Sequence, residues 1–99
     1  MRANFDEIDV LNTDIYGDNI FYRGNEIFTG TIVEYNNEGV VIGELTVVNG
    51  TINGRVALYY DNGQIMEEGF KKYNRYYGSF KEWDKNGKLI KQVDFGAEP

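Results

Sequence analysis

The chain has 99 residues, which predicts a single domain. Its composition combines 15% aromatic residues and 12 glycines with one proline, and its formal net charge is −6. The absence of cysteine excludes disulfides and thiol chemistry, and the absence of histidine excludes histidine-dependent triads and His-ligated metal sites.

Residues 1–19 are rich in Asp and Asn and contain scattered apolar side chains without a regular period. We interpret them as a loosely held N-terminal extension that contains a strand or a short helical turn. The start of the chain lacks the basic head and apolar core of a secretory signal, and no apolar run is long enough to span a bilayer. These features predict a cytoplasmic protein.

Residues 20–29 predict a short hairpin that turns at Gly24-Asn25. This hairpin is shorter than the units that follow it and is out of register with them. Terminal units of repeat proteins often differ in this way, so we assign the segment as a capping hairpin.

A period of 24 residues begins at Gly30 and continues at Gly54 and Gly78. It divides the chain into units of about 30–53, 54–77 and 78–95. Each leading glycine is followed nine residues later by another glycine, at Gly39, Gly63 and Gly87. Five residues after it stands an aromatic side chain, at Tyr35, Tyr59 and Trp83. Apolar pairs follow eleven and twelve residues after it, at Val41-Ile42, Ile65-Met66 and Leu89-Ile90. A fixed period of this length is typical of a repeat array.

Each unit predicts an antiparallel hairpin, because turn residues such as Asn62-Gly63 and Asn86-Gly87 separate two runs rich in β-forming residues. No stretch has the 3.6-residue apolar spacing of an amphipathic helix. We therefore predict an all-β fold, a repeat array of antiparallel β-hairpins that forms one elongated, twisted, single-layer sheet. Residues 96–99 are expected to fray.

The spacing within each unit does not fit a flat strand. The apolar residue Ile32 and the aromatic Tyr35 differ by three positions, and the other two units repeat this offset. Regular alternation would place two such residues on opposite faces of the sheet. Either the sheet buries both faces locally, or a bulge near the aromatic residue redirects its side chain.

Charge is distributed unevenly along the chain. Residues 1–50 carry two basic and nine acidic residues, whereas residues 51–99 carry eight basic and seven acidic residues. An acidic half attracts basic partners and repels nucleic acid and anionic lipid. Plain solvation explains a net charge of this size equally well.

The sequence predicts no catalytic residues, no metal site and no cofactor. Glu67 and Glu68 are expected to point to opposite faces of a strand, and a carboxylate pair of Glu82 and Asp84 lacks the cleft that hydrolysis needs. The Asp and Asn residues of the hairpin turns do not have EF-hand spacing, and turn formation explains them. We expect a protein that is not an enzyme.

Lysines and aromatic residues alternate between positions 71 and 81, a combination found in single-strand nucleic-acid binders. The acidic net charge and the regular placement of the rings argue against this function. We therefore expect no nucleic-acid partner.

Two segments resemble a known repeat family. The run from Tyr59 to Phe70 (YYDNGQIMEEGF) and the run from Trp83 to Ile90 (WDKNGKLI) are similar to MORN repeats in their bacterial variant form. Residues 20–30 (IFYRGNEIFTG) resemble the segment that opens the first repeat in the YwqK-like antitoxin group. The resemblance covers about residues 20–95, although Leu45 and Val93 stand where the second unit has Gly69.

The resemblance implies a ladder of β-hairpins and an immunity or antitoxin role, in which the protein neutralises a cognate secreted toxin, often a nuclease or deaminase. It transfers no catalytic residues. Acidity suits a basic toxin, and aromatic side chains are common at interface hot spots. We therefore predict these partner-binding residues: Asp14, Asp18, Tyr22, Glu26, Glu34, Glu38, Glu44, Tyr60, Tyr76 and Tyr77.

Two alternatives stay open. MORN repeats also suggest a scaffold or a membrane-associated interaction module, for which only residues 71–91 offer basic side chains. Weak homo-oligomerisation through an exposed edge strand is the other alternative.

Overall fold

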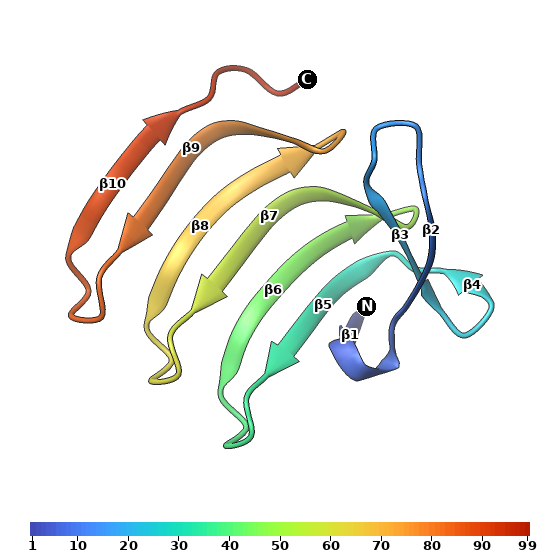
Figure 1. The fold of residues 1–99 in the computed structure, drawn as a ribbon, viewed down its shortest axis with the longest axis horizontal. Coiled ribbons are helices and arrows are strands. Elements are labelled where there is room, and N and C mark those ends of the chain that lie inside the picture. The colour runs from blue at the N-terminus through green and yellow to red at the C-terminus, as the bar shows by residue number, and fades with distance from the viewer.

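The computed structural model describes residues 1–99 as two sheets (Figure 1). The main sheet has seven strands in the order β1 (Arg2–Asn4), β5 (Gly30–Tyr35), β6 (Val41–Val48), β7 (Thr51–Tyr59), β8 (Ile65–Lys72), β9 (Arg75–Trp83) and β10 (Leu89–Asp94). The small sheet has the order β2 (Asp9–Thr13), β3 (Asn19–Arg23) and β4 (Glu26–Ile27). A single 3₁₀ turn, η1 (Phe5–Glu7), joins β1 to β2.

The all-β prediction is confirmed, but the prediction of one elongated antiparallel sheet is wrong in two respects. The chain forms a second sheet, and the main sheet is mixed because β1 pairs with β5 in parallel. The molecule measures 41 × 37 × 19 Å, so it is a plate with two long dimensions. The hairpins from β5 to β10 follow one another in simple antiparallel order.

One turn type recurs at four hairpins. In the β9–β10 turn, the Asp84 amide donates to the Lys88 carbonyl, and the Asp84 carboxylate accepts from two amides further along the turn. The same backbone bonds close the β2–β3, β5–β6 and β7–β8 turns. The fourth residue of each turn has a positive φ, which favours glycine: Gly17, Gly39, Gly63 and Gly87. The β2–β3 hairpin therefore shares the repeat turn, although it stands outside the 24-residue period.

The offset between apolar and aromatic positions places the two side chains on opposite faces of the sheet, because each register shift lies in the return strand and not in the strand that carries both residues. Tyr35 pairs with Val41 while its neighbour Glu34 pairs with Gly43, which leaves Ile42 as the extra residue. The β7–β8 and β9–β10 hairpins shift register at Tyr59 and Trp83 in the same way. The second member of each apolar pair is thus the bulged residue. The alternative that a bulge redirects the aromatic side chain is therefore wrong, whereas burial on both faces holds in the first unit, because the consecutive Ile32 and Val33 are each 1% exposed.

Cross-strand pairing defines the two faces of the main sheet, because directly paired residues lie on the same face. We call the front face the side that carries Ala3, Ile32, Leu45, Val56 and Gly69, which are paired in that order from β1 to β8. The back face carries Val33, Glu44, Ala57, Glu68 and Lys81, which are paired in that order from β5 to β9.

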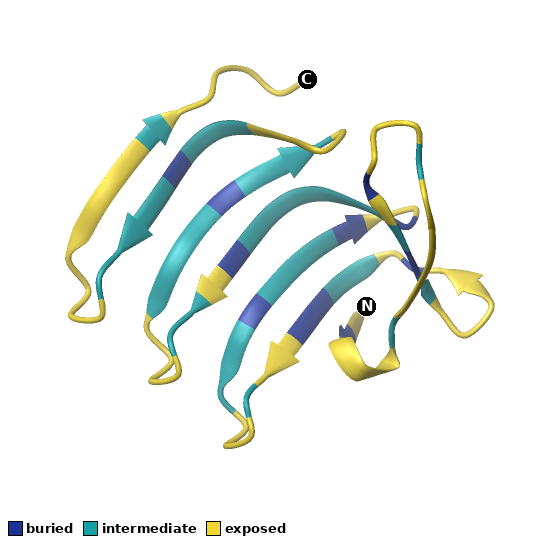
Figure 2. Ribbon diagram, viewed as in Figure 1, coloured by how far each residue is buried: buried dark blue, intermediate teal, exposed yellow.

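The core lies where the small sheet covers the front face (Figure 2). Phe21 of β3 and Phe28 pack against Ala3, Ile32 and Val47. Backbone hydrogen bonds join this cover to the β6–β7 turn. The Phe21 amide donates to the Gly50 carbonyl at 2.7 Å, and the Gly50 amide donates to the Phe28 carbonyl at 2.8 Å.

The terminal segments differ from what the sequence predicts. Residues 1–19 are not a loose extension, because Ala3 is buried in the core and the β2–β3 tip contacts the main sheet, with the Tyr16 and Tyr73 rings 5.0 Å apart. The hairpin at 20–29 forms with its turn at Gly24-Asn25, but it lies across the front face instead of extending the array (Figure 1). In the C-terminal tail, Glu98 forms an ion pair with Lys72 at 3.1 Å.

Replacing Ala3 with Asp should destabilise the fold by about 3 kcal/mol or more, because it places an unpaired carboxylate in the core. Urea unfolding monitored by tryptophan fluorescence measures this loss. The control is Asn25→Asp in an exposed turn, which should change stability by less than about 0.5 kcal/mol. An Ala3→Asp protein as stable as this control would show that β1 does not contribute to the core.

Candidate interaction surface

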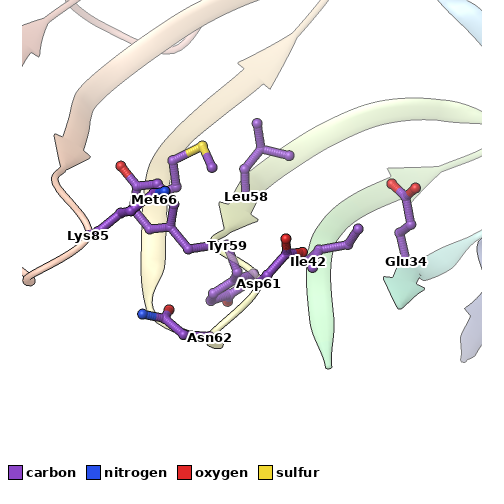
Figure 3. A pocket seen from close by; sticks show the side chains of 9 residues that line it. Glu34, Ile42, Leu58, Tyr59, Asp61, Asn62, Met66 and Lys85 are labelled. Atoms are coloured by element: carbon purple, nitrogen blue, oxygen red, sulfur yellow. The ribbon is translucent and has the colours of Figure 1, made fainter. Parts of the chain in front are cut away.

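The small sheet leaves the remainder of the front face uncovered, and three adjoining hollows lie there. Their volumes are about 630, 190 and 180 Å³, and Leu58 lines all three. We call this surface the open groove and define it by Glu34, Gly43, Leu45, Leu58, Glu67 and Tyr76. Figure 3 shows the largest hollow, with Leu58 and Met66 near its centre and Glu34 on the far side of β6.

One cross-strand row crosses the open groove. It runs through Glu34, Gly43, Leu58, Glu67, Glu82 and Lys91, from β5 to β10. Glu67 and Glu82 stand directly opposite each other, an arrangement of like charges that disfavours the folded state. Burial, followed by the charge of Glu82, raises the pKa of Glu67, and nearby Lys91 opposes this shift. The carboxylates of Glu34, Glu67 and Glu82 form no ion pair within the chain.

An aromatic cluster borders the open groove on the β9 side. The Tyr76 ring lies 5.2 Å from Phe80 and 5.6 Å from Phe95, and the Lys71 ammonium lies 5.2 Å from the centre of the Tyr76 ring. These rings lie over Gly69, where an added Cβ would stand only 2.9 Å from the Phe80 ring. Glycine at this position therefore allows the aromatic cluster to pack flat on β8.

On the back face, the carboxylates of Glu44 and Glu68 form ion pairs with arginines of the same chain. Arg55 lies 2.7 Å from the Glu68 carboxylate and 3.5 Å from that of Glu44, which also pairs with Arg2 at 3.6 Å. The Tyr59 hydroxyl donates a hydrogen bond to Glu44. This bond, together with the charges of Arg55 and Arg2, lowers the pKa of Glu44. The charges of this face are largely satisfied within the chain, unlike those of the open groove.

The structure brings three of the ten predicted partner-binding residues to the open groove. Glu34 and Tyr76 belong to it, and Tyr60 lines its largest hollow while its hydroxyl donates to the Trp83 carbonyl at 2.7 Å. Glu44 and Tyr77 lie on the back face, where Tyr77 contacts the Phe70 ring.

The other five predicted residues lie elsewhere. Glu38 is exposed at the β5–β6 turn, and Tyr22 and Glu26 belong to the small sheet, where the Tyr22 hydroxyl donates to Asn12. The Asp14 carboxylate accepts hydrogen bonds from two amides of its own turn. Asp18, also predicted to bind the partner, is only 5% exposed and lies at the end of the β2–β3 turn.

Sequence reasoning missed Leu58, Glu67 and Glu82 as neighbours in one surface. The prediction that Glu67 and Glu68 point to opposite faces is confirmed, since Glu67 belongs to the front face and Glu68 to the back. Pairing the hairpins with a bulge at each aromatic residue would have aligned Glu67 with Leu58. The missing signal was the bulge, which determines the register.

The structure contains no group of three or more Asp, Glu, His or Cys side chains arranged to hold a metal ion. It also contains no helix that is long and apolar enough to cross a bilayer.

Comparison with protein families gives one result that bears on the repeats. Residues 52–70 and 76–95 match the family model described as MORN repeat variant. These two segments are similar to MORN repeats. They correspond to β7–β8 and β9–β10, which are the two hairpins beside the Glu67–Glu82 pair. Comparisons with curated proteins and with solved structures give no significant match.

The similarity to MORN repeats suggests a repeat-based scaffold for protein–protein or membrane interaction. The β7–β10 hairpins supply the floor and one side of the open groove, whereas β5 and β6 supply the other side.

Two glycines of the front face give a matched stability test. Gly69→Ala should destabilise the protein by about 1–3 kcal/mol, because the added methyl group would collide with Phe80 and Tyr76. Gly43→Ala should change the free energy of unfolding by less than about 0.5 kcal/mol, or raise it slightly, because the added Cβ would lie 3.6–3.8 Å from its nearest neighbours. Urea unfolding compares them, and equal effects would contradict the packing described.

The environment of Asp18 predicts a pH-dependent stability difference. Burial, followed by the charge of Asp14, raises the pKa of Asp18, and one of its carboxylate oxygens has no hydrogen-bond partner. Because the folded pKa exceeds the unfolded one, ionisation disfavours folding. This penalty is fully present above the folded pKa and vanishes as the pH falls below the ordinary carboxyl pKa of about 3.9.

Asp18→Asn should therefore stabilise the protein at neutral pH and lose this advantage near about pH 3. Urea unfolding of both proteins at the two pH values measures the difference. An Asn variant that is less stable than the unaltered chain at neutral pH would contradict the assignment.

Proposed function

We propose that this protein is a bacterial immunity protein, which binds a cognate secreted toxin domain and blocks the toxin's active site. The observation that carries the proposal is the open groove, an uncovered apolar surface with two carboxylates, Glu34 and Glu67, that have no ion pair within the chain. In this proposal the protein acts in the cytoplasm by binding alone, without catalysis and without a cofactor.

The chemistry of the groove favours a basic protein partner. Leu45 and Leu58 supply apolar area, and the side chain of Leu58 is 42% exposed. Burial of such area by a partner is favourable, and a complementary positive charge would relieve the repulsion between Glu67 and Glu82. Domains that bind nucleic acid are commonly basic, so a nuclease or deaminase toxin would supply this charge.

A membrane-associated role is less well supported. A lipid-binding face would need its basic residues on one side of the sheet. Lys71 and Lys91 belong to the front face, whereas Lys81 belongs to the back face and Lys72 is paired with Glu98. The basic residues of the second half are thus divided between the two faces.

The test is co-expression with candidate toxin domains encoded beside its gene, scored by bacterial growth and by recovery of a stoichiometric complex. The proposal predicts restored growth with one such domain. Binding to anionic vesicles in a sedimentation assay, or self-association without any toxin complex, would instead favour the scaffold or oligomer alternatives.

Charge reversal in the groove tests the surface. The double variant Glu34→Lys/Glu67→Lys should reduce the association rate constant with a basic toxin by about tenfold at low salt, and by less at high salt. Glu38→Lys in the exposed β5–β6 turn is the control and should have a smaller effect. An unchanged association rate of the double variant, measured by stopped flow, would contradict the groove as the binding surface.

A further inference from the structure

We propose that the open groove contains a slot for one basic side chain, the aliphatic part of an arginine or lysine lying above Gly43 and its charged head at Glu34. The identity of the partner rests on the proposed function, whereas the slot itself rests on the geometry of the front face.

Gly43 creates the slot because it interrupts a row of side chains. In the cross-strand row it stands between Glu34 of β5 and Leu58 of β7, and it contributes no side chain of its own. A hollow of about 180 Å³ lies at this position, and Ile32, Leu45 and Leu58 supply apolar walls. The register thus places a gap in the sheet surface between one carboxylate and one leucine.

The neighbouring atoms match the two parts of a basic side chain. A Cβ built on Gly43 would lie 3.7 Å from Glu34 Oε1 and 3.8 Å from Leu58 Cδ2, so carboxylate and apolar surface are both next to the slot. Arginine and lysine have an apolar stem and a cationic end, and such side chains cover apolar surface while the head contacts a carboxylate.

Glu34 is available for this contact. It forms neither an ion pair nor a side-chain hydrogen bond within the chain, whereas Glu44, its neighbour on the opposite face, is paired with two arginines. The hollow is also open to solvent at Glu34, which is an exposed residue. A neutral aliphatic side chain would fill the slot but leave this carboxylate unpaired.

The experiment is an NMR titration of the isotope-labelled full chain with the blocked tripeptide Leu-Arg-Leu, compared with Leu-Gln-Leu. Leu-Arg-Leu should give saturable shifts at the Gly43 amide and the Leu58 methyl groups. Its dissociation constant should be about fivefold lower than that of Leu-Gln-Leu, a factor typical of an exposed ion pair. Glu34→Gln should remove this difference, and the control Glu38→Gln should retain it.

Gly43→Val provides a second variant, because its side chain would occupy the slot in a strand position that accepts β-branched residues. It should lose the shifts at Leu58 while keeping the dispersed spectrum of the folded chain. Equal affinity for both peptides, or Leu-Arg-Leu shifts at Leu58 that persist in Gly43→Val, would overturn the slot.

The titration requires no toxin, so it separates this inference from the proposed function. Absence of growth rescue would reject the proposed immunity function and leave the peptide result valid. A toxin that binds the Gly43→Val protein as tightly as the unaltered chain would overturn the slot while the immunity proposal stands.

Discussion

The packing of Phe21 and Phe28 onto Ile32 and Val47 is the interaction on which the rest of the structure depends, because it covers one part of the main sheet and buries the apolar cluster there. Hydrogen bonds from the cover to Gly50 fix its position on the β6–β7 turn. Because the small sheet spans only the N-terminal part of the front face, the buried apolar cluster lies there, whereas Ala57 and Phe80 are buried further along the main sheet. The rest of the same face stays open and forms the open groove.

The two faces of the main sheet use charge in opposite ways. On the back face, Arg55 joins Glu44 to Glu68, so the carboxylates are compensated by the chain's own guanidinium groups. On the front face, Glu67 and Glu82 oppose each other and Glu34 has no partner. A partner that places positive charge over the front face would relieve the repulsion between Glu67 and Glu82, which would favour binding. The carboxylates of the back face are already paired and offer no comparable gain.

The period and the turn residues predict the hairpins from β5 to β10, because turns with glycine at a positive φ are specified locally. Long-range contacts explain what sequence reasoning did not predict. Ala3 forms a parallel pair with Ile32, and nothing in residues 1–19 alone indicates this partner. One local signal was overlooked: the run from Asp14 to Asp18 has the same turn pattern as Asp84 to Lys88. Recognising it would have predicted the β2–β3 hairpin and the structural role of Asp14.

The same contrast applies to the candidate surface. Acidity alone selected Glu34, which lies in the open groove, but it also selected Glu44 and Asp18, which are ion-paired or buried within the fold. The face on which a residue lies depends on register, and register depends on the bulges at the hairpin aromatics.

The most direct test of the account is hydroxyl-radical footprinting of the protein with and without a toxin domain of the proposed kind. Met66 and Tyr76 line the open groove and report on the front face. Tyr35 and Trp83 report on the back face, because each stands two residues after a back-face residue of its strand, Val33 and Lys81 respectively. The account predicts that the complex protects Met66 and Tyr76 from oxidation and leaves Tyr35 and Trp83 unchanged. Protection of Tyr35 and Trp83, with Met66 and Tyr76 still reactive, would contradict it.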